Sequence, residues 1–216
     1  TYDKKKEFTK SFAFRMKTDS EKKLTRNTGF YERTSKLTRN FVDARGFWLP
    51  NDYTKHGVIN EHIACREKAV VIDLSSLRKF EILGPDAEDL MNYTLTRNIK
   101  KLSVGQIVYS AMCYENGTMF DDGTLLRLSE TGFRWVCGDE YAGEWLKEQA
   151  KNKNLKVVIK NSTDQINNIS VQGPNSRKIL EKIIFTPPTQ PTISELQWFR
   201  FTICRLEELN GIPLIV

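Results

Sequence analysis

The sequence of 216 residues contains few of the residues that build metal centres and disulfide frameworks. It has four cysteines and two histidines, and no two cysteines form a Cys-x-x-Cys pair. Such a pair, or a cluster of histidines, is the usual signature of a zinc site. We therefore expect no metal site, and we expect reduced cysteines, which are typical of a cytoplasmic protein.

Long hydrophobic runs are also missing. No apolar stretch approaches the roughly 20 residues that a membrane-spanning helix needs, so we expect no contact with a membrane. Hydrophobic residues make up 39% of the chain and charged residues 28%, which is the balance of an ordinary globular domain. A chain of this length can bury a sizeable core of its own.

The positive charge of the chain is concentrated near its beginning. Residues 1–40 contain 12 Lys and Arg but five Asp and Glu, whereas the remaining residues contain 21 and 22. A basic segment can attract a polyanion such as nucleic acid, but it can equally be a solvated arm. We interpret residues 1–40 as a basic N-terminal arm and residues 41–216 as one domain, and we do not expect nucleic acid as a partner.

The pattern of apolar residues predicts a mixed α+β fold. Residues 40–53 are expected to form a loop, because Gly46 and Pro50 interrupt regular structure. Two short strands, residues 80–83 and 169–172, are each followed by Gly-Pro and then by a helical pattern. Proline suits the first turn of a helix. The recurrence of strand, Gly-Pro corner and helix about ninety residues apart favours a duplicated α+β unit over an alternating doubly wound sheet.

Residues 107–128 carry the strongest local signal in the sequence. Two apolar strands flank Asn116-Gly117, a dipeptide typical of a two-residue type I′ hairpin turn. With that turn, Tyr109 lies opposite Thr124, and Ala111 lies opposite Asp122. Tyr109, Ala111, Asp122, Thr124 and Leu126 then share one face of the sheet, and Asp121 points to the other. A longer or bulged turn would exchange the two aspartates.

The predicted hairpin face could bind a flat ligand. A carboxylate would lie beside a tyrosine and opposite an alanine that is too small to fill the space. Asp121-Asp122-Gly123 can also be a solvated turn without any function. Two adjacent carboxylates can indicate a divalent metal, but the chain has no third ligand at a suitable spacing.

Six short motifs occur in order between about residues 44 and 180. They are Gly46-Phe47-Trp48-Leu49-Pro50 with Tyr53, Glu61-His62 with Arg66, Ile72-Asp73-Leu74-Ser75, Gly105-Gln106 with Tyr109, Asp121-Asp122, and Gln172-Gly173-Pro174. Together they resemble the folate-binding domain of the glycine-cleavage T-protein (aminomethyltransferase) family. Each motif alone is modest, but six in register are specific.

The resemblance implies an α+β folate-binding domain of duplicated units, normally followed by a barrel-like C-terminal domain. It implies tetrahydrofolate as cofactor, aminomethyl or methyl transfer as activity, and a small-molecule donor of that group. A carrier protein or a dehydrogenase is a further expected partner. The family's next segment is expected beyond residues 212–216, so we expect this chain to be incomplete at that end and inactive alone. The alternative is a non-enzymatic folate-binding accessory protein for tRNA modification with the same fold.

The resemblance also implies roles for single residues. The principal catalytic aspartate falls on Asp122. The pterin pocket falls on Tyr109, Leu77, Thr124, Leu126, Val136 and Gly138. Three motifs depart from the family: Ser75-Ser76-Leu77 replaces Ser-His-Met, Gly138 replaces a folate-binding asparagine, and Gly117-Thr118 replaces Gly-Gly before the aspartates. These departures favour a divergent branch, similar to dimethylsulfoniopropionate demethylase or to the folate domains of sarcosine and dimethylglycine dehydrogenases.

Overall fold

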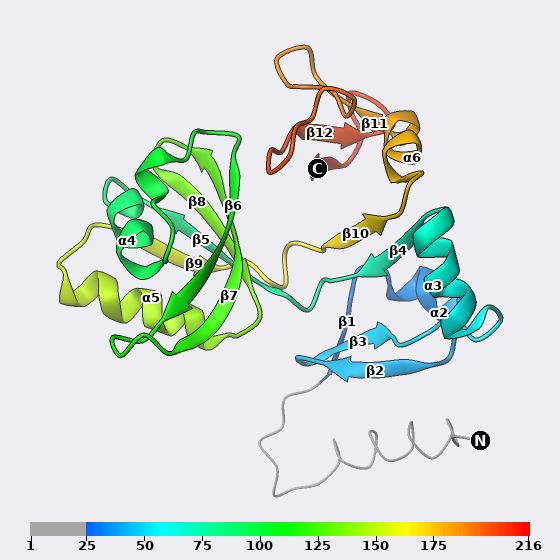
Figure 1. Ribbon diagram of the computed structural model, residues 1–216, viewed down its shortest axis with the longest axis horizontal. Coiled ribbons are helices and arrows are strands. Elements are labelled where there is room, and N and C mark those ends of the chain that lie inside the picture. The colour runs from blue at the N-terminus through cyan, green and yellow to red at the C-terminus, as the bar shows by residue number, and fades with distance from the viewer. Residues whose placement is uncertain (1–24) are drawn as a thin grey trace, which may run out of the picture. The chain divides into compact units, whose positions relative to one another are not determined.

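The computed structural model describes residues 25–216, so most of the expected basic arm lies outside the described residues. The chain divides into two compact units. The first contains the residues before 77 together with 167–176, and the second contains 77–166 and 177–216. Both combine helices and strands (Figure 1), as the sequence predicts. No helix within residues 25–216 is both long and apolar enough to cross a bilayer.

The first unit contains two small sheets and two helices. The three-stranded sheet has the order β1-β3-β2, and the two-stranded sheet joins β4 to β10 antiparallel. The elements are β1 (Arg26–Asn27), α2 (Tyr31–Leu37), β2 (Phe41–Ala44), β3 (Phe47–Pro50), α3 (Gly57–Glu67), β4 (Val70–Asp73) and β10 (Ile169–Gln172).

The loop predicted for residues 40–53 is wrong, because β2 and β3 form a hairpin there. Arg45 (φ 55°) and Gly46 (φ 81°) form its turn, and positive φ at both positions is the hallmark of a type I′ turn. Phe47, Trp48 and Leu49 are buried. Gly46 therefore marks the turn of a hairpin, and burial of the following aromatic and aliphatic side chains holds the strand.

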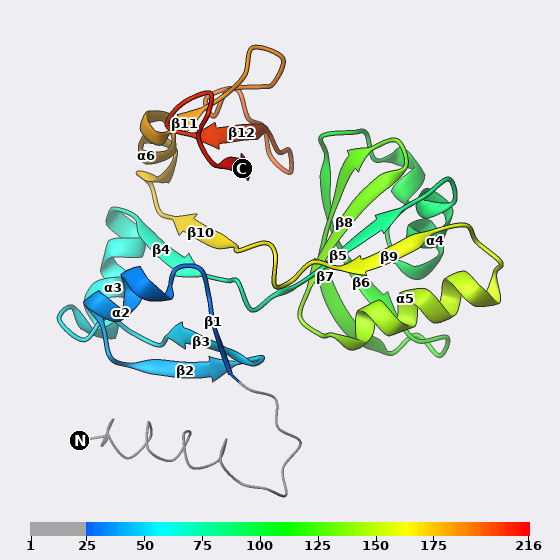
Figure 2. The same ribbon diagram turned by 180° about the vertical axis from the view of Figure 1, so that it is seen from behind.

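The second unit contains a five-stranded antiparallel sheet of order β6-β7-β8-β5-β9. Its strands are β5 (Arg78–Leu83), β6 (Ile107–Cys113), β7 (Met119–Ser129), β8 (Gly132–Cys137) and β9 (Val158–Asn161). Two helices, α4 (Ala87–Thr94) and α5 (Tyr141–Asn152), pack against one face of this sheet (Figures 1 and 2). The core between them includes Phe80, Ile82, Leu90, Met91, Met112, Leu125, Phe133, Trp135, Ala142 and Leu146.

The remainder of the second unit is a small three-stranded sheet of order β11-β12-β13. Helix α6 (Ser176–Ile183) precedes it, and its strands are β11 (Ile184–Phe185), β12 (Ile203–Leu206) and β13 (Pro213–Ile215). The amide of Ile107 donates to the Phe199 carbonyl at 2.9 Å, and the amide of Phe201 donates to the Gly105 carbonyl at 3.1 Å. These bonds attach the segment before β12 to the start of β6.

The two predicted Gly-Pro corners are present and have similar geometry. Gly84 (φ 138°) follows β5, and Gly173 (φ 124°) follows β10. A Cβ atom at Gly84 would lie 2.4 Å from the Lys156 carbonyl oxygen, and one at Gly173 would lie 2.6 Å from that of Lys68. Each corner therefore requires glycine both for its conformation and for a close approach of two backbones. The sequence analysis interprets the two strand, Gly-Pro corner and helix segments as copies of one duplicated unit, and this stays a prediction.

We expect Gly84→Ala to destabilise the protein far more than Gly105→Ala. Both glycines have positive φ, but nothing lies within 4 Å of a Cβ at Gly105. Gly105→Ala, the control, should therefore lower the free energy of unfolding by about 1 kcal/mol, because alanine is strained at a positive φ. Gly84→Ala adds a clash with a backbone carbonyl and should cost about 3 kcal/mol or more. Urea denaturation of both variants measures the difference, and equal costs would show that the corner relaxes freely.

Candidate functional site

The register predicted for the hairpin of β6 and β7 is confirmed along most of its length. Tyr109 pairs with Thr124, Ala111 pairs with Asp122, and Met112 pairs with Asp121. Asp122 therefore lies on the face that carries Tyr109, and Asp121 lies on the face that carries the core residue Met112.

The turn of this hairpin differs from the prediction. The amide of Tyr114 donates to the Thr118 carbonyl, so the loop has three residues instead of two. Gly117 has positive φ (84°) and Asn116 does not, which excludes a type I′ turn. The register survives because Phe120 is an extra, bulged residue in β7, between the pairs Cys113–Met119 and Met112–Asp121. The extra residue in the turn shifts the pairing of the two strands by one position, and the bulged residue shifts it back.

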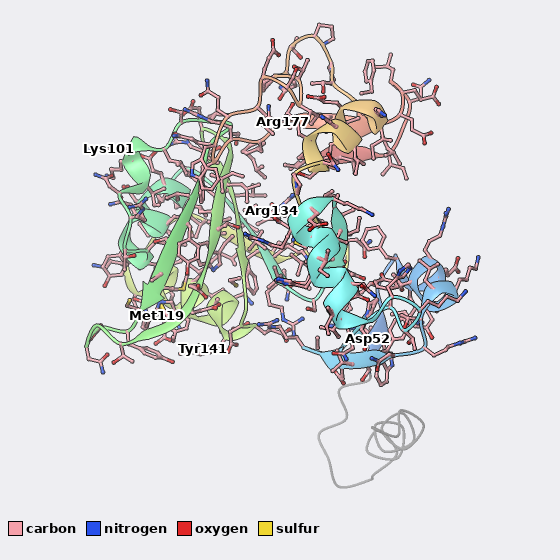
Figure 3. The ribbon with its side chains drawn as sticks, turned by 45° about the vertical axis from the view of Figure 1, so that its right-hand side comes forward. Asp52, Lys101, Met119, Arg134, Tyr141 and Arg177 are labelled. Carbon is pink, nitrogen blue, oxygen red and sulfur yellow. The ribbon has the colours of Figure 1, made fainter. Side chains whose placement is uncertain are left out.

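The bulged Phe120 is held by aromatic packing. Its ring centroid lies 4.8 Å from that of Tyr114, 5.6 Å from that of Trp145 and 5.7 Å from that of Tyr141. Edge-on and tilted ring pairs at these distances are favourable. This cluster at the end of the sheet (Figure 3, near Met119 and Tyr141) therefore helps to fix which aspartate faces which side.

Five of the residues that the sequence predicts for the site lie on one face of the five-stranded sheet, which we call the Asp122 face: Tyr109, Asp122, Thr124, Leu126 and Val136. Leu77 and Gly138 lie one residue outside β5 and β8. Val136 pairs with Thr124, and Leu126 follows Thr124 by two residues. Arg78 pairs with Cys137, and Gly123 also pairs with Cys137. Continuing this register by one residue places Leu77, Gly138 and Asp122 in one row across three strands. The alternate residues Leu125, Trp135 and Cys137 belong to the core beneath the helices.

Tyr109 and Asp122 interact directly on this face. The Tyr109 hydroxyl donates a hydrogen bond to Oδ2 of Asp122. This bond, with smaller effects of desolvation and of the Asp122 charge, raises the pKa of Tyr109 above its ordinary value. The phenol therefore keeps its proton at neutral pH and remains a donor. Tyr109 is 52% exposed in the chain, so its ring offers a free aromatic surface.

Asp121 has a different environment, since it is buried with 8% exposure. Its carboxylate accepts backbone N–H bonds from Asp122 (2.9 Å), Gly138 (3.3 Å) and Asp139 (3.1 Å). These bonds tie the end of β8 to β7 at the point where Asp122 and Gly138 meet. Asp121 therefore fixes the backbone positions of Asp122 and Gly138 from the opposite face of the sheet.

Three charged residues on the Asp122 face escaped the sequence analysis: Lys79, Glu81 and Arg134. Lys79 pairs with Val136 and is 1% exposed. Glu81 accepts from Arg134 Nε at 2.7 Å and from Ser162 Oγ at 2.8 Å (Figure 3 labels Arg134). The sequence does contain a signal for these three residues. They alternate with the apolar residues of β5 and β8, and such alternation predicts that they lie on the face opposite the core.

Among residues 25–216, no three His, Cys, Asp or Glu side chains gather in a way that could hold a metal ion. The cysteines differ instead in their surroundings. Cys137 is buried, and this burial, followed by the nearby Asp121 carboxylate, raises the pKa of its thiol strongly. Burial also raises the pKa of Cys204, while Cys65 and Cys113 are partly exposed.

We expect iodoacetamide at about pH 8.5 to alkylate Cys65 and Cys113 and to spare Cys137. Alkylation requires an accessible thiolate, and Cys137 offers neither access nor charge. Peptide mass mapping measures the labelling, and labelling in denaturant provides the control in which all four cysteines react. Fast native labelling of Cys137 would contradict the position of β8 in the core.

Comparisons with known proteins found relatives of similar sequence. The chain is 50% identical over 216 residues to trimethylamine-oxide aldolase of Ruegeria pomeroyi, covering 100% of the chain and 27% of that protein. It is 32% identical over 197 residues to an aminomethyltransferase of Symbiobacterium thermophilum, covering 88% of the chain and 50% of that protein. The chain thus spans half or less of the length of these relatives.

A solved structure has the same fold. The glycine cleavage system aminomethyltransferase T from Bartonella henselae matches 82% of the chain and 47% of its own, with a TM-score of 0.68 and 25% identity. The sequence model of one family, described as the GCVT N-terminal domain, matches residues 30–216. Since that match extends over nearly all of the described residues, the chain belongs to the GCVT N-terminal domain family.

Proposed function

We propose that this chain binds tetrahydrofolate on its Asp122 face and belongs to an enzyme that transfers a one-carbon unit to this cofactor. The observation that carries the proposal is the Tyr109–Asp122 hydrogen bond on an open sheet face, in a chain of the GCVT N-terminal domain family. A carboxylate held by a phenol beside Thr124 and Val136 is a suitable partner for a ring with neighbouring N–H groups.

The residues of this face fit a pterin ring. Among the described residues, Tyr109 is the one donor that forms a hydrogen bond with the Asp122 side chain. The carboxylate therefore has acceptor positions left for the N–H groups of a ligand. Gly138 lies next to Asp122 and adds no side chain, which leaves room for a ring. Thr124 and Val136 lie on the same face, and Tyr109 offers its ring for stacking.

When bound, tetrahydrofolate supplies a nucleophilic nitrogen, N5, that can take up a one-carbon unit. The Asp122 carboxylate would accept hydrogen bonds from the pterin, hold a proton released during transfer and stabilise a cationic donor group. The Tyr109 hydroxyl would fix the orientation of that carboxylate. Holding both reactants in register would supply much of the remaining rate enhancement.

The nature of the one-carbon donor is proposed from two relatives. Their names describe an aminomethyl group and trimethylamine oxide, and in both the carbon is bonded to nitrogen. We therefore propose a methylated or aminomethylated nitrogen compound as donor. Since the chain spans half or less of these relatives, the proposal assigns to this chain the folate step alone.

Calorimetric titration with tetrahydrofolate tests the proposal through two matched substitutions. Thr124→Trp places a large side chain on the Asp122 face, and Thr118→Trp places the same side chain on the exposed hairpin loop. We expect the first to abolish binding and the second to leave the affinity unchanged. Absence of binding to the unmodified protein, or equal loss in both variants, would contradict the proposed site.

A second measurement separates the enzyme from the accessory protein. We expect the full-length protein to produce 5,10-methylenetetrahydrofolate from an aminomethyl or amine-oxide donor, because the first already carries its carbon at the oxidation level of formaldehyde and the N–O bond of the second supplies the oxidant. A methylated amine without an N–O bond would give 5-methyltetrahydrofolate instead. Absorbance or mass spectrometry distinguishes the two products. Folate binding without turnover of any methylated amine, amine oxide or sulfonium compound would instead favour a non-enzymatic folate-binding protein.

A further inference from the structure

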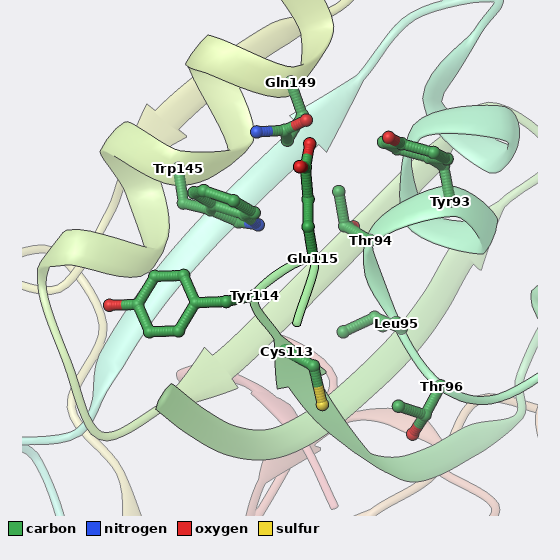
Figure 4. A pocket seen from close by; sticks show the side chains of 9 residues that line it. All are labelled: Tyr93, Thr94, Leu95, Thr96, Cys113, Tyr114, Glu115, Trp145 and Gln149. Carbon is green, nitrogen blue, oxygen red and sulfur yellow. The ribbon is translucent and has the colours of Figure 1, made fainter. Parts of the chain in front are cut away.

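A pocket of about 220 Å³ lies on the helix-covered side of the sheet, away from the Asp122 face. It opens between the end of α4, the end of β6 and helix α5 (Figure 4). Its lining residues are Tyr93, Thr94, Leu95, Thr96, Cys113, Tyr114, Glu115, Trp145 and Gln149. Trp145 and Gln149 come from neighbouring turns of α5, so one helix face contributes both.

One buried polar atom of this pocket has no partner, and a buried residue beside it makes no side-chain hydrogen bond. Gln149 is 6% exposed as a residue, and within residues 25–216 no hydrogen bond reaches its side-chain amide. The Trp145 indole N–H is buried and also has no hydrogen-bond partner in the described part of the chain. A buried polar group without a hydrogen bond destabilises the fold. Both groups point into the pocket (Figure 4), so a ligand could satisfy them.

Glu115 is the one charged side chain that lines the pocket. Its carboxylate forms no ion pair with any described residue, and it points toward the Gln149 amide (Figure 4). The rings of Tyr93 and Trp145 flank it. The ammonium of Lys153 lies 4.0 Å from the Tyr93 ring centroid, which shows that an ammonium group packs well on this ring. Carboxylate and aromatic rings together favour a cation.

We infer that this pocket binds a small organic ammonium ion that also carries an oxygen atom. The ammonium group would lie between the Glu115 carboxylate and the Trp145 ring, where charge and cation–π attraction act together. The oxygen would accept the indole N–H of Trp145 and the amide N–H of Gln149. The volume suits a compact molecule with few heavy atoms, since drug-sized ligands need larger pockets. This site is independent of folate binding.

The test compares choline with 3,3-dimethylbutanol, which has the same shape and hydroxyl group but no charge. Isothermal titration calorimetry measures the affinity of the chain for each compound directly. We expect choline to bind with a measurable heat. The neutral alcohol should bind at least severalfold more weakly.

Substitutions locate the cation. Glu115→Gln should weaken choline binding about fivefold, measured by calorimetry. Glu144→Gln is the matched control, because Glu144 is exposed on α5 and pairs with Lys147 at 2.9 Å outside the pocket. Trp145→Phe should also weaken binding while retaining a ring. Equal affinity for choline and the neutral alcohol, no binding of either, or unchanged affinity in Glu115→Gln would each overturn the inference.

Discussion

Asp122→Asn should lower folate-dependent one-carbon transfer by at least about 100-fold, while the free energy of unfolding changes by less than about 0.5 kcal/mol. The amide cannot hold a proton, and it presents an NH₂ group where the pterin needs an acceptor. The fold should tolerate the change, because Asp122 is partly exposed and its side chain bonds to Tyr109 on the open face. Turnover assays on the full-length protein and urea denaturation measure the two effects.

Tyr109→Phe is the control for the role of Asp122. It removes the hydroxyl that orients the carboxylate and leaves the ring for stacking. We expect a smaller loss of turnover than in Asp122→Asn, since the carboxylate itself remains. If Tyr109→Phe proves the more damaging change, the hydroxyl takes part in the reaction directly and the role given to Asp122 is wrong.

Asp121→Asn should destabilise the fold by about 1–3 kcal/mol. The buried carboxylate accepts three backbone N–H bonds, and an amide offers one oxygen in place of two. Its NH₂ group would face the backbone donors of Gly138 or Asp139. For a chain of this size each kcal/mol lowers Tm by about 2–4 °C, so thermal unfolding detects the loss.

Asp139→Asn is the matched control for this effect. Asp139 is exposed, and its carboxylate accepts a single N–H bond from Tyr141 at 2.8 Å, a bond that asparagine can also accept. We expect little change in Tm. If Asp121→Asn is as stable as Asp139→Asn but loses more activity than Asp122→Asn, then Asp121 faces the ligand and the register of β7 is wrong.

Local sequence signals predicted the two Gly-Pro corners and the hairpin of β6 and β7. The strands that precede the corners, at residues 80–83 and 169–172, are also present. Such features depend on short-range geometry and on the periodicity of apolar residues. The hairpin of residues 40–53 was missed because Gly46 and Pro50 were interpreted as breaks. Burial of Phe47 and Trp48 is a property of the folded chain.

The sequence by itself determined which residues could share the Asp122 face, because strand residues alternate between faces with a period of two. Only the tertiary structure decided that Asp122 and Tyr109 do share it. The three-residue loop shifts the register by one position, and the bulge at Phe120 shifts it back. That bulge depends on the rings of Tyr141 and Trp145, which belong to a helix that follows later in the chain. Contacts between segments distant in sequence leave no local pattern, so the choice between the two aspartates required the folded molecule.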